Sequence, residues 1–130
     1  MLAFVVAVAV PLAAHAQNQW TGIGAIRGTA MFMDTTSIRR VGTIASVWIR
    51  SLDSTPRQFV TGRDTITFDT VIGLNEFDCS HGTRAVGAVR YMLGDEVVFE
   101  VPVTHDPPAI IDARSFFGAI YRDLCRSVRQ

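Results

Sequence analysis

The sequence predicts an α+β fold: a mainly antiparallel β-sheet of about five to six strands with one C-terminal α-helix that a disulfide ties to the sheet. Three observations lead to this prediction. Strand-type residues alternate between Trp20 and Pro102, the apolar period becomes helical from Phe117, and the chain has two cysteines, Cys79 and Cys125. A length of 130 residues fits a single domain, and 48% hydrophobic against 18% charged residues excludes disorder as the main state.

A targeting segment precedes this domain. Residues 1–16 form an uncharged run that ends in Ala14-His15-Ala16, the small-x-small pattern that signal peptidase accepts. Its apolar part spans thirteen residues, whereas a membrane-spanning helix needs about 20, so we expect no stable membrane span. We predict cleavage after Ala16 and a single mature domain over residues 17–130. The compartment would be the periplasm, the outer-membrane surface or the medium.

The first predicted strands lie between Trp20 and Arg50. The run 29–34 is short and apolar, and Asp34 starts a turn over residues 34–37 through side-chain oxygens. Residues 43–50 carry apolar side chains on both faces, which is typical of a central strand. Residues 51–63 are polar and contain a proline and a glycine, so we expect an exposed loop there. This loop supplies four candidate ligand-contact residues: Asp53, Arg57, Gln58 and Arg63.

The second half of the predicted sheet starts with residues 65–72, where β-branched residues alternate with period 2. Gly73 breaks this strand or marks a bulge, and beyond it Phe77 and Cys79 face inward. Gly94-Asp95 lies between two apolar runs and indicates a hairpin. Three prolines then end the sheet region, because proline cannot donate to a β-ladder: Pro102, Pro107 and Pro108.

The C-terminal segment has the period of an amphipathic helix, and Asp112 is its candidate N-cap. Arginines occupy mostly the polar side of this helix. The apolar stripe faces the sheet, which brings Cys125 toward Cys79. The stripe consists of Phe117, Ile120, Tyr121, Leu124, Cys125 and Val128.

The two cysteines are expected to form a disulfide, because an exported chain meets an oxidising environment. Cys79 and Cys125 are 46 positions apart, and closing a loop of that length would stabilise the fold by roughly 4 kcal/mol. The chain has no Cys-x-x-Cys spacing. Two thiolates with scattered histidines also lack the clustering of a zinc site, so we expect neither a metal site nor a cofactor.

Seven further residues follow one another in a definite order with the two cysteines: Trp20, Asp34, Ser37, Ile38, Trp48, Asp78 and Arg84. In this order and spacing the chain resembles the surface-adhesin protein E family of bacterial exported proteins. The resemblance implies an antiparallel sheet with a small C-terminal helix, binding to host or extracellular-matrix proteins, and a homodimer. We expect structural roles for five of these residues: Asp34, Ser37, Trp48, Asp78 and Arg84. Unlike the founding members, the chain has no cysteine for lipidation near the cleavage point, and its 51–63 segment contains no lysine.

The charge balance and the motifs argue against two classes of function, nucleic-acid binding and serine hydrolysis. Twelve basic residues balance twelve acidic ones, so we expect no nucleic-acid partner. The segment 78–81 brings a carboxylate, a hydroxyl and an imidazole together, but it lacks the G-x-S-x-G elbow of serine hydrolases. The missing catalytic motif, together with what the resemblance implies, leads us to expect a non-enzymatic binding module that recognises an extracellular or envelope protein. The alternative is a small periplasmic hydrolase that uses His81 or His105.

Overall fold

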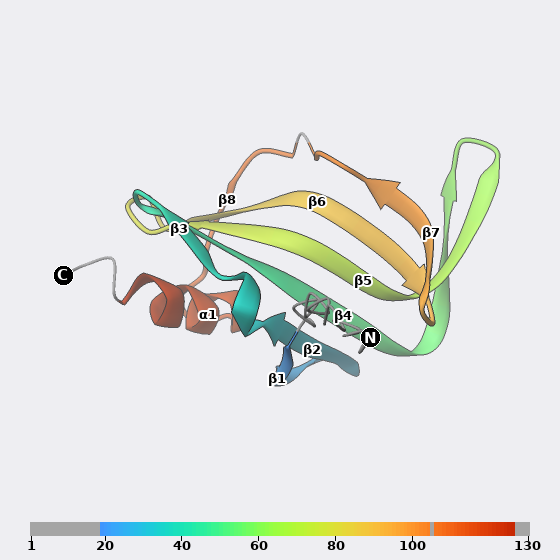
Figure 1. Cartoon of the computed structure of the whole chain (residues 1–130), viewed down its shortest axis with the longest axis horizontal. Coiled ribbons are helices and arrows are strands. Elements are labelled where there is room, and N and C mark those ends of the chain that lie inside the picture. Colours follow the sequence, from blue (N-terminus) through green and yellow to red (C-terminus); the bar gives the residue numbers. More distant parts are fainter. Residues whose placement is uncertain (1–18, 105, 127–130) are drawn as a thin grey trace, which may run out of the picture.

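The structure is a computed structural model that describes residues 19–104 and 106–126, and these residues form one antiparallel sheet of eight strands with one α-helix (Figure 1). The predicted α+β class is confirmed. The strands are β1 (Trp20–Ile26), β2 (Thr29–Asp34), β3 (Arg39–Val41), β4 (Ile44–Thr61), β5 (Asp64–Asp78), β6 (Thr83–Leu93), β7 (Glu96–Val101) and β8 (Ala109–Ile110). A 3-10 turn, η1 (Thr35–Ser37), follows β2, and the helix is α1 (Phe116–Cys125). The predicted signal peptide, His105 and Val128 lie outside the described residues.

The strand order is β1-β2-β4-β5-β6-β7, and the two shortest strands pair at the sides, β3 with β4 and β8 with β6. These two strands explain why the sheet has more than the expected five to six. The expectation that the prolines end the sheet was also wrong, since β8 follows Pro108 and pairs with Thr83 and Arg84. Proline cannot donate to the ladder, and pairing with β6 resumes at Ala109, directly after Pro108.

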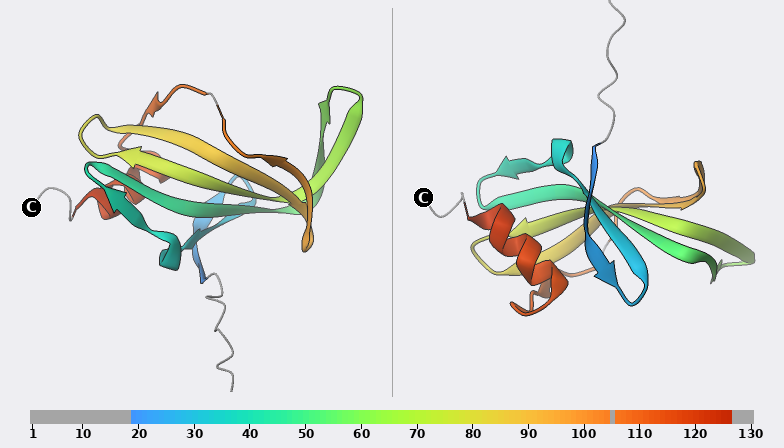
Figure 2. Two further views of the ribbon diagram at one scale, coloured as in Figure 1. Left: turned by 45° about the horizontal axis from the view of Figure 1, so that its top comes forward. Right: turned by 90° about the horizontal axis from the view of Figure 1, so that it is seen from below.

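The core lies between α1 and one end of the sheet, where the helix lies against one face of the strands (Figure 2). Side chains of β4 and β5 that point to this face are excluded from solvent, and Ala45, Val47 and Phe77 are 0% exposed. Ile120 and Leu124 of α1 pack against them. Burying side chains of this size stabilises the fold by about 1.5–3 kcal/mol each. Phe77 and Cys79 are buried in this core, which confirms that they face inward.

The helix begins later than the sequence predicts. Ser115 is the N-cap, since its Oγ accepts a hydrogen bond from the Gly118 N–H at 3.1 Å. Asp112 occupies the turn before the helix, where its carboxylate accepts from the Arg114 N–H and its carbonyl from the Ser115 N–H. The N-cap assignment to Asp112 was wrong because both residue types can cap, and this tight turn uses up the carboxylate.

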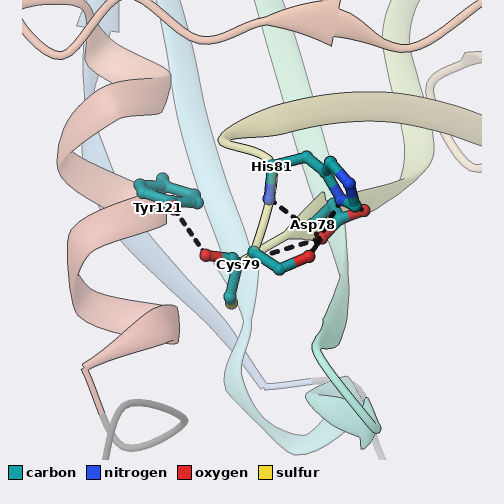
Figure 3. Close-up of polar contacts among 5 residues, drawn as sticks. Asp78, Cys79, His81 and Tyr121 are labelled. Atoms are coloured by element: carbon teal, nitrogen blue, oxygen red, sulfur yellow. Dashed lines mark hydrogen bonds and ion pairs between the residues drawn. The ribbon is translucent and has the colours of Figure 1, made fainter.

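The predicted disulfide between Cys79 and Cys125 is present, with the two Cα atoms 5.5 Å apart. Cys79 follows directly after β5, and Cys125 is the last residue of α1. Figure 3 shows a second tie at the same place: the hydroxyl of Tyr121 donates to the carbonyl oxygen of Cys79 at 2.9 Å. The C-terminal helix is thus held to the end of β5 by a covalent bond and a hydrogen bond.

Residues 51–63 are not a loop, which corrects the prediction for this segment. β4 continues to Thr61 and pairs with β5 on both sides of a bulge between Leu52 and Arg57. The bulge contains Pro56, whose missing N–H therefore interrupts no ladder bond. Gly62 then makes the tight turn with a φ of 59°. The distal end of this hairpin turns upward in the view of Figure 1.

A second apolar cluster supports the hairpin. Phe59 and Phe68 of the hairpin contact Tyr91 of β6 and Phe99 of β7, with neighbouring ring centroids 4.9–6.0 Å apart. Tilted and edge-to-face arrangements of this kind stabilise by about 0.5–1.5 kcal/mol per pair beyond their burial. The distal part of the β4–β5 hairpin, residues 57–68, which we call the hairpin arm, is therefore part of the folded sheet.

Removing the disulfide should destabilise the fold and free the helix. For the double variant Cys79→Ala/Cys125→Ala we expect the free energy of unfolding in urea to fall by roughly 4 kcal/mol, because the unfolded chain gains the entropy of the opened loop. Amide hydrogen exchange should accelerate in α1 more than in β4 and β5. Reductant should have the same effect on the natural protein and none on the variant. Equal stability of the two proteins would contradict the expected role of the disulfide.

Gly118 should resist replacement by alanine, although alanine favours helices by about 1 kcal/mol. A Cβ at this position would lie 2.5 Å from the Asp112 carbonyl oxygen and 2.7 Å from that of Ala113. We expect Gly118→Ala to lower the free energy of unfolding by about 1–3 kcal/mol, since such overpacking forces the backbone to move. Ala119→Gly at the exposed neighbouring position gives the effect of helix propensity alone. An increase in stability for Gly118→Ala would contradict the packing at this turn.

Candidate functional site

The sheet face opposite α1, which we call the open face, carries a row of directly paired residues across five strands. The row runs from β2 to β7 through strand-paired neighbours: Phe32, Arg50, Ile72, Arg90 and Glu100. Neighbours in such a row have Cβ atoms about 4.5–5.5 Å apart. The row therefore sets two arginines among apolar and aromatic side chains on one surface.

Arg50 of β4 lies in this row between Phe32 and Ile72. Its guanidinium carbon is 4.5 Å from the ring centroid of Phe32 and 4.9 Å from that of Trp20. Its Nε is buried and has no hydrogen-bond partner among the described residues. The rings stabilise the cation through their negative faces, but they accept no ordinary N–H hydrogen bond.

Arg90 has a different environment on the same face. Its Nε lies 3.2 Å from a carboxylate oxygen of Glu100, and its guanidinium carbon is 5.4 Å from the ring centroid of Trp48. Both side chains of this ion pair are more than half exposed, so it contributes little to stability. Arg90 is nevertheless held over Trp48 and neutralised by a carboxylate.

Two hollows indent the open face on either side of Trp20 and Ile72. The first has a volume of about 340 Å³ and the second about 430 Å³, within the usual range for small-ligand or side-chain sites. The first is lined by Trp20, Asp34, Thr36, Ser37, Arg39, Trp48, Ile72 and Arg90. The second is lined by Trp20, Arg50, Leu52, Asp69, Thr70, Ile72, Met92, Gly94 and Asp95.

The turn predicted after Asp34 builds one wall of the first hollow. The Asp34 carboxylate accepts hydrogen bonds from the Thr36 N–H at 3.0 Å and the Thr36 hydroxyl at 2.6 Å. The hydroxyl of Ser37 donates to the Asp34 carbonyl at 2.7 Å and accepts from the Trp48 N–H at 3.0 Å. This turn is therefore fastened to β4. It brings four pattern residues, Trp20, Asp34, Ser37 and Trp48, into one hollow.

The other pattern residues lie elsewhere. Ile38 packs against the core beneath α1. Arg84 is half-buried on the helix side, where its Nε donates to the Asn75 side-chain oxygen at 2.7 Å. Its guanidinium carbon is 3.6 Å from the ring centroid of Phe117. Burial lowers the pKa of Arg84, which still has a packing role because its contacts join β5, β6 and α1.

The four residues of the predicted contact loop do not gather into one site. Asp53 and Arg57 form an ion pair at 3.0 Å across the bulge, and the Thr29 hydroxyl donates to the same carboxylate at 2.6 Å. Gln58 donates to the Thr67 hydroxyl across the hairpin at 3.3 Å, and Arg63 is exposed at the hairpin turn. These contacts support the hairpin arm.

The Asp78, Ser80 and His81 side chains meet in an exposed turn after β5 (Figure 3). The Asp78 carboxylate lies 2.8 Å from His81 Nδ1, and the Ser80 hydroxyl lies 2.9 Å from that same nitrogen. A catalytic triad needs the carboxylate and the nucleophile on opposite nitrogens of the imidazole. Here both groups contact Nδ1, so the ring cannot accept a proton from Ser80 on one nitrogen while Asp78 orients it through the other. Hydrogen bonds from Ser80, first of all from its hydroxyl, lower the pKa of Asp78 to about 2.

Residues 19–104 and 106–126 contain neither a cluster of metal ligands nor a membrane-spanning helix. No group of three or more histidine, cysteine, aspartate or glutamate side chains in these ranges could hold a metal ion. No helix there has the length and apolar character that a membrane crossing requires. Both cysteines are in the disulfide.

Comparison with models of known protein families gives no match, and neither does comparison with curated proteins. The resemblance to surface-adhesin protein E is therefore a hypothesis that the order of the pattern residues alone supports.

Sequence reasoning missed Arg50 as a site residue. The alternation of residues 43–50 places Trp48 and Arg50 on one strand face, which is a signal that the sequence does contain. It does not contain the pairing of Arg50 with Phe32, or the approach of Trp20. Those contacts depend on strand register between segments far apart in the chain.

Asp78 should titrate at an unusually low pH. Its pKa of about 2 in the folded protein lies below the 3.8 of a free side chain, so its hydrogen bonds favour the folded state above pH 4. This contribution should disappear as the pH falls from about 4 to 2. NMR titration of the Asp78 carboxyl carbon measures this pKa directly. We expect Ser80→Ala to raise the midpoint of the titration. A midpoint near 4 in the natural protein would contradict this turn geometry.

Proposed function

We propose that this protein is an exported binding module that contacts a protein ligand through the open face of its sheet. One observation carries the proposal: α1 covers one face, whereas the opposite face has two hollows that share Trp20 and Ile72. Tryptophan and arginine are the residue types that dominate the binding energy of protein interfaces. Trp20, Trp48, Arg50 and Arg90 together supply that chemistry on one surface.

Export is part of the proposal. The disulfide supports it, because disulfides form and persist in oxidising compartments. The signal-peptide pattern of residues 1–16 supports it independently. The resemblance to surface-adhesin protein E favours an extracellular or envelope protein as the ligand, and a homodimer as the assembly.

The hydrolase alternative has less support. His81 is present with a carboxylate and a hydroxyl, but both contact one nitrogen of its ring. The side chain of His81 is 75% exposed, and no hollow described above includes it. A binding function needs no proton transfer by His81. The open face already has the residue types that a protein-binding surface requires.

Site-specific photo-crosslinking tests the proposed surface. We expect p-benzoylphenylalanine in place of Leu52, an exposed residue of the second hollow, to capture a partner protein in the producing cells. The same group in place of Ala113, which is exposed before α1, is the matched control and should capture none. A third position, Arg63, tests the hairpin turn. Capture at Ala113 or Arg63 but not at Leu52 would contradict the open face as the contact surface, as would the absence of any adduct.

A further inference from the structure

We propose that Arg50 binds a carboxylate side chain, glutamate or aspartate, of a peptide segment in the protein partner, within the second hollow of the open face. This inference deepens the proposed function and rests on it. It specifies the chemistry of the ligand that one residue, Arg50, contacts.

The guanidinium of Arg50 lacks a hydrogen-bond acceptor among the described residues. Arg50 and Arg84 are the described arginines that are not exposed. Arg84 donates to the side-chain oxygen of Asn75, whereas Arg50 has ring contacts alone and a buried Nε without a partner. The exposed arginines Arg57 and Arg90 each have a carboxylate. A partly desolvated guanidinium without an acceptor is costly, and a ligand that supplies one recovers that cost.

The guanidinium of Arg50 is also held in place. Contacts with the rings of Phe32 and Trp20 restrict its side chain before any ligand arrives. A planar, fixed fork of N–H donors matches the two oxygens of a carboxylate. Because the donors are already positioned, less conformational entropy is lost on binding.

The acidic residues of the second hollow do not neutralise Arg50. The Asp69 carboxylate accepts from the Gly94 N–H at 3.2 Å and from the Thr70 hydroxyl at 2.9 Å, and it forms no ion pair with Arg50. Asp95 lines the same hollow and makes no ion pair with Arg50 either. These two carboxylates would repel a doubly charged phosphate more than a singly charged carboxylate. The apolar walls at Ile72 and Met92 suit the aliphatic stem of an acidic side chain.

The test compares two dipeptides that differ in one charge. The protein is labelled with 15N, and the Nε–Hε signal of Arg50 is followed while acetyl-Glu-Leu-amide or acetyl-Gln-Leu-amide is added. We expect saturable binding of the glutamate dipeptide, with a Kd at least about tenfold lower than that of the glutamine dipeptide, as a charge-assisted bidentate contact predicts. The comparison is made on the natural protein, so it does not depend on the folding of a variant.

Arg50→Gln should abolish the difference between the dipeptides, and Arg63→Gln, at an exposed arginine of the hairpin turn, should preserve it. Equal affinity for the two dipeptides would overturn the inference, as would no shift of the Arg50 signal with either. Tighter binding of inorganic phosphate or of phosphatidylglycerol vesicles than of the glutamate dipeptide would overturn it too. None of these results affects the crosslink at Leu52, so the proposed function and this inference can fail separately.

Discussion

The Cys79–Cys125 disulfide fastens α1 to one face of the sheet, where Ile120 and Leu124 pack against the strands. It joins the last residue of α1 to the end of β5, and Tyr121 adds a hydrogen bond to the same backbone. With its C-terminal end fixed there, α1 lies over the side of the sheet that contains Val47 and Phe77. The opposite side is left to the two hollows. The covalent bond lies on one face of the sheet, and the aromatic and arginine side chains around Trp20 and Trp48 lie on the other.

The two half-buried arginines show how the faces differ. Arg84 stacks on Phe117 of the helix, and its Nε donates a hydrogen bond to the Asn75 side-chain oxygen inside the fold. Arg50 also lies against aromatic rings, but its Nε has no acceptor among the described residues. Similar contacts with aromatic rings therefore accompany a guanidinium with a hydrogen-bond acceptor in one place and a buried Nε without one in the other.

The local elements could be predicted from the sequence because their signals are short-range. The alternation of residues 43–50, the turn at Asp34 and the apolar stripe of α1 each occupy fewer than about 15 consecutive residues. Residues 51–63 misled the prediction because polar composition and Pro56 are typical of loops, whereas a bulge and the cluster around Phe59 keep them in the sheet. The candidate site could not be predicted, since Trp20, Phe32 and Arg50 meet only through strand register.

The state of the two thiols in the natural protein tests the central claim most directly, because the fixed helix and the export proposal both depend on it. Protein recovered from the producing cells would be treated with an alkylating agent before and after reduction, and its mass measured. We expect no modification before reduction, modification of both cysteines afterwards, and a chain that starts at Gln17. Two alkylated cysteines without reduction, in a chain that retains residues 1–16, would contradict the tie and the exported compartment together.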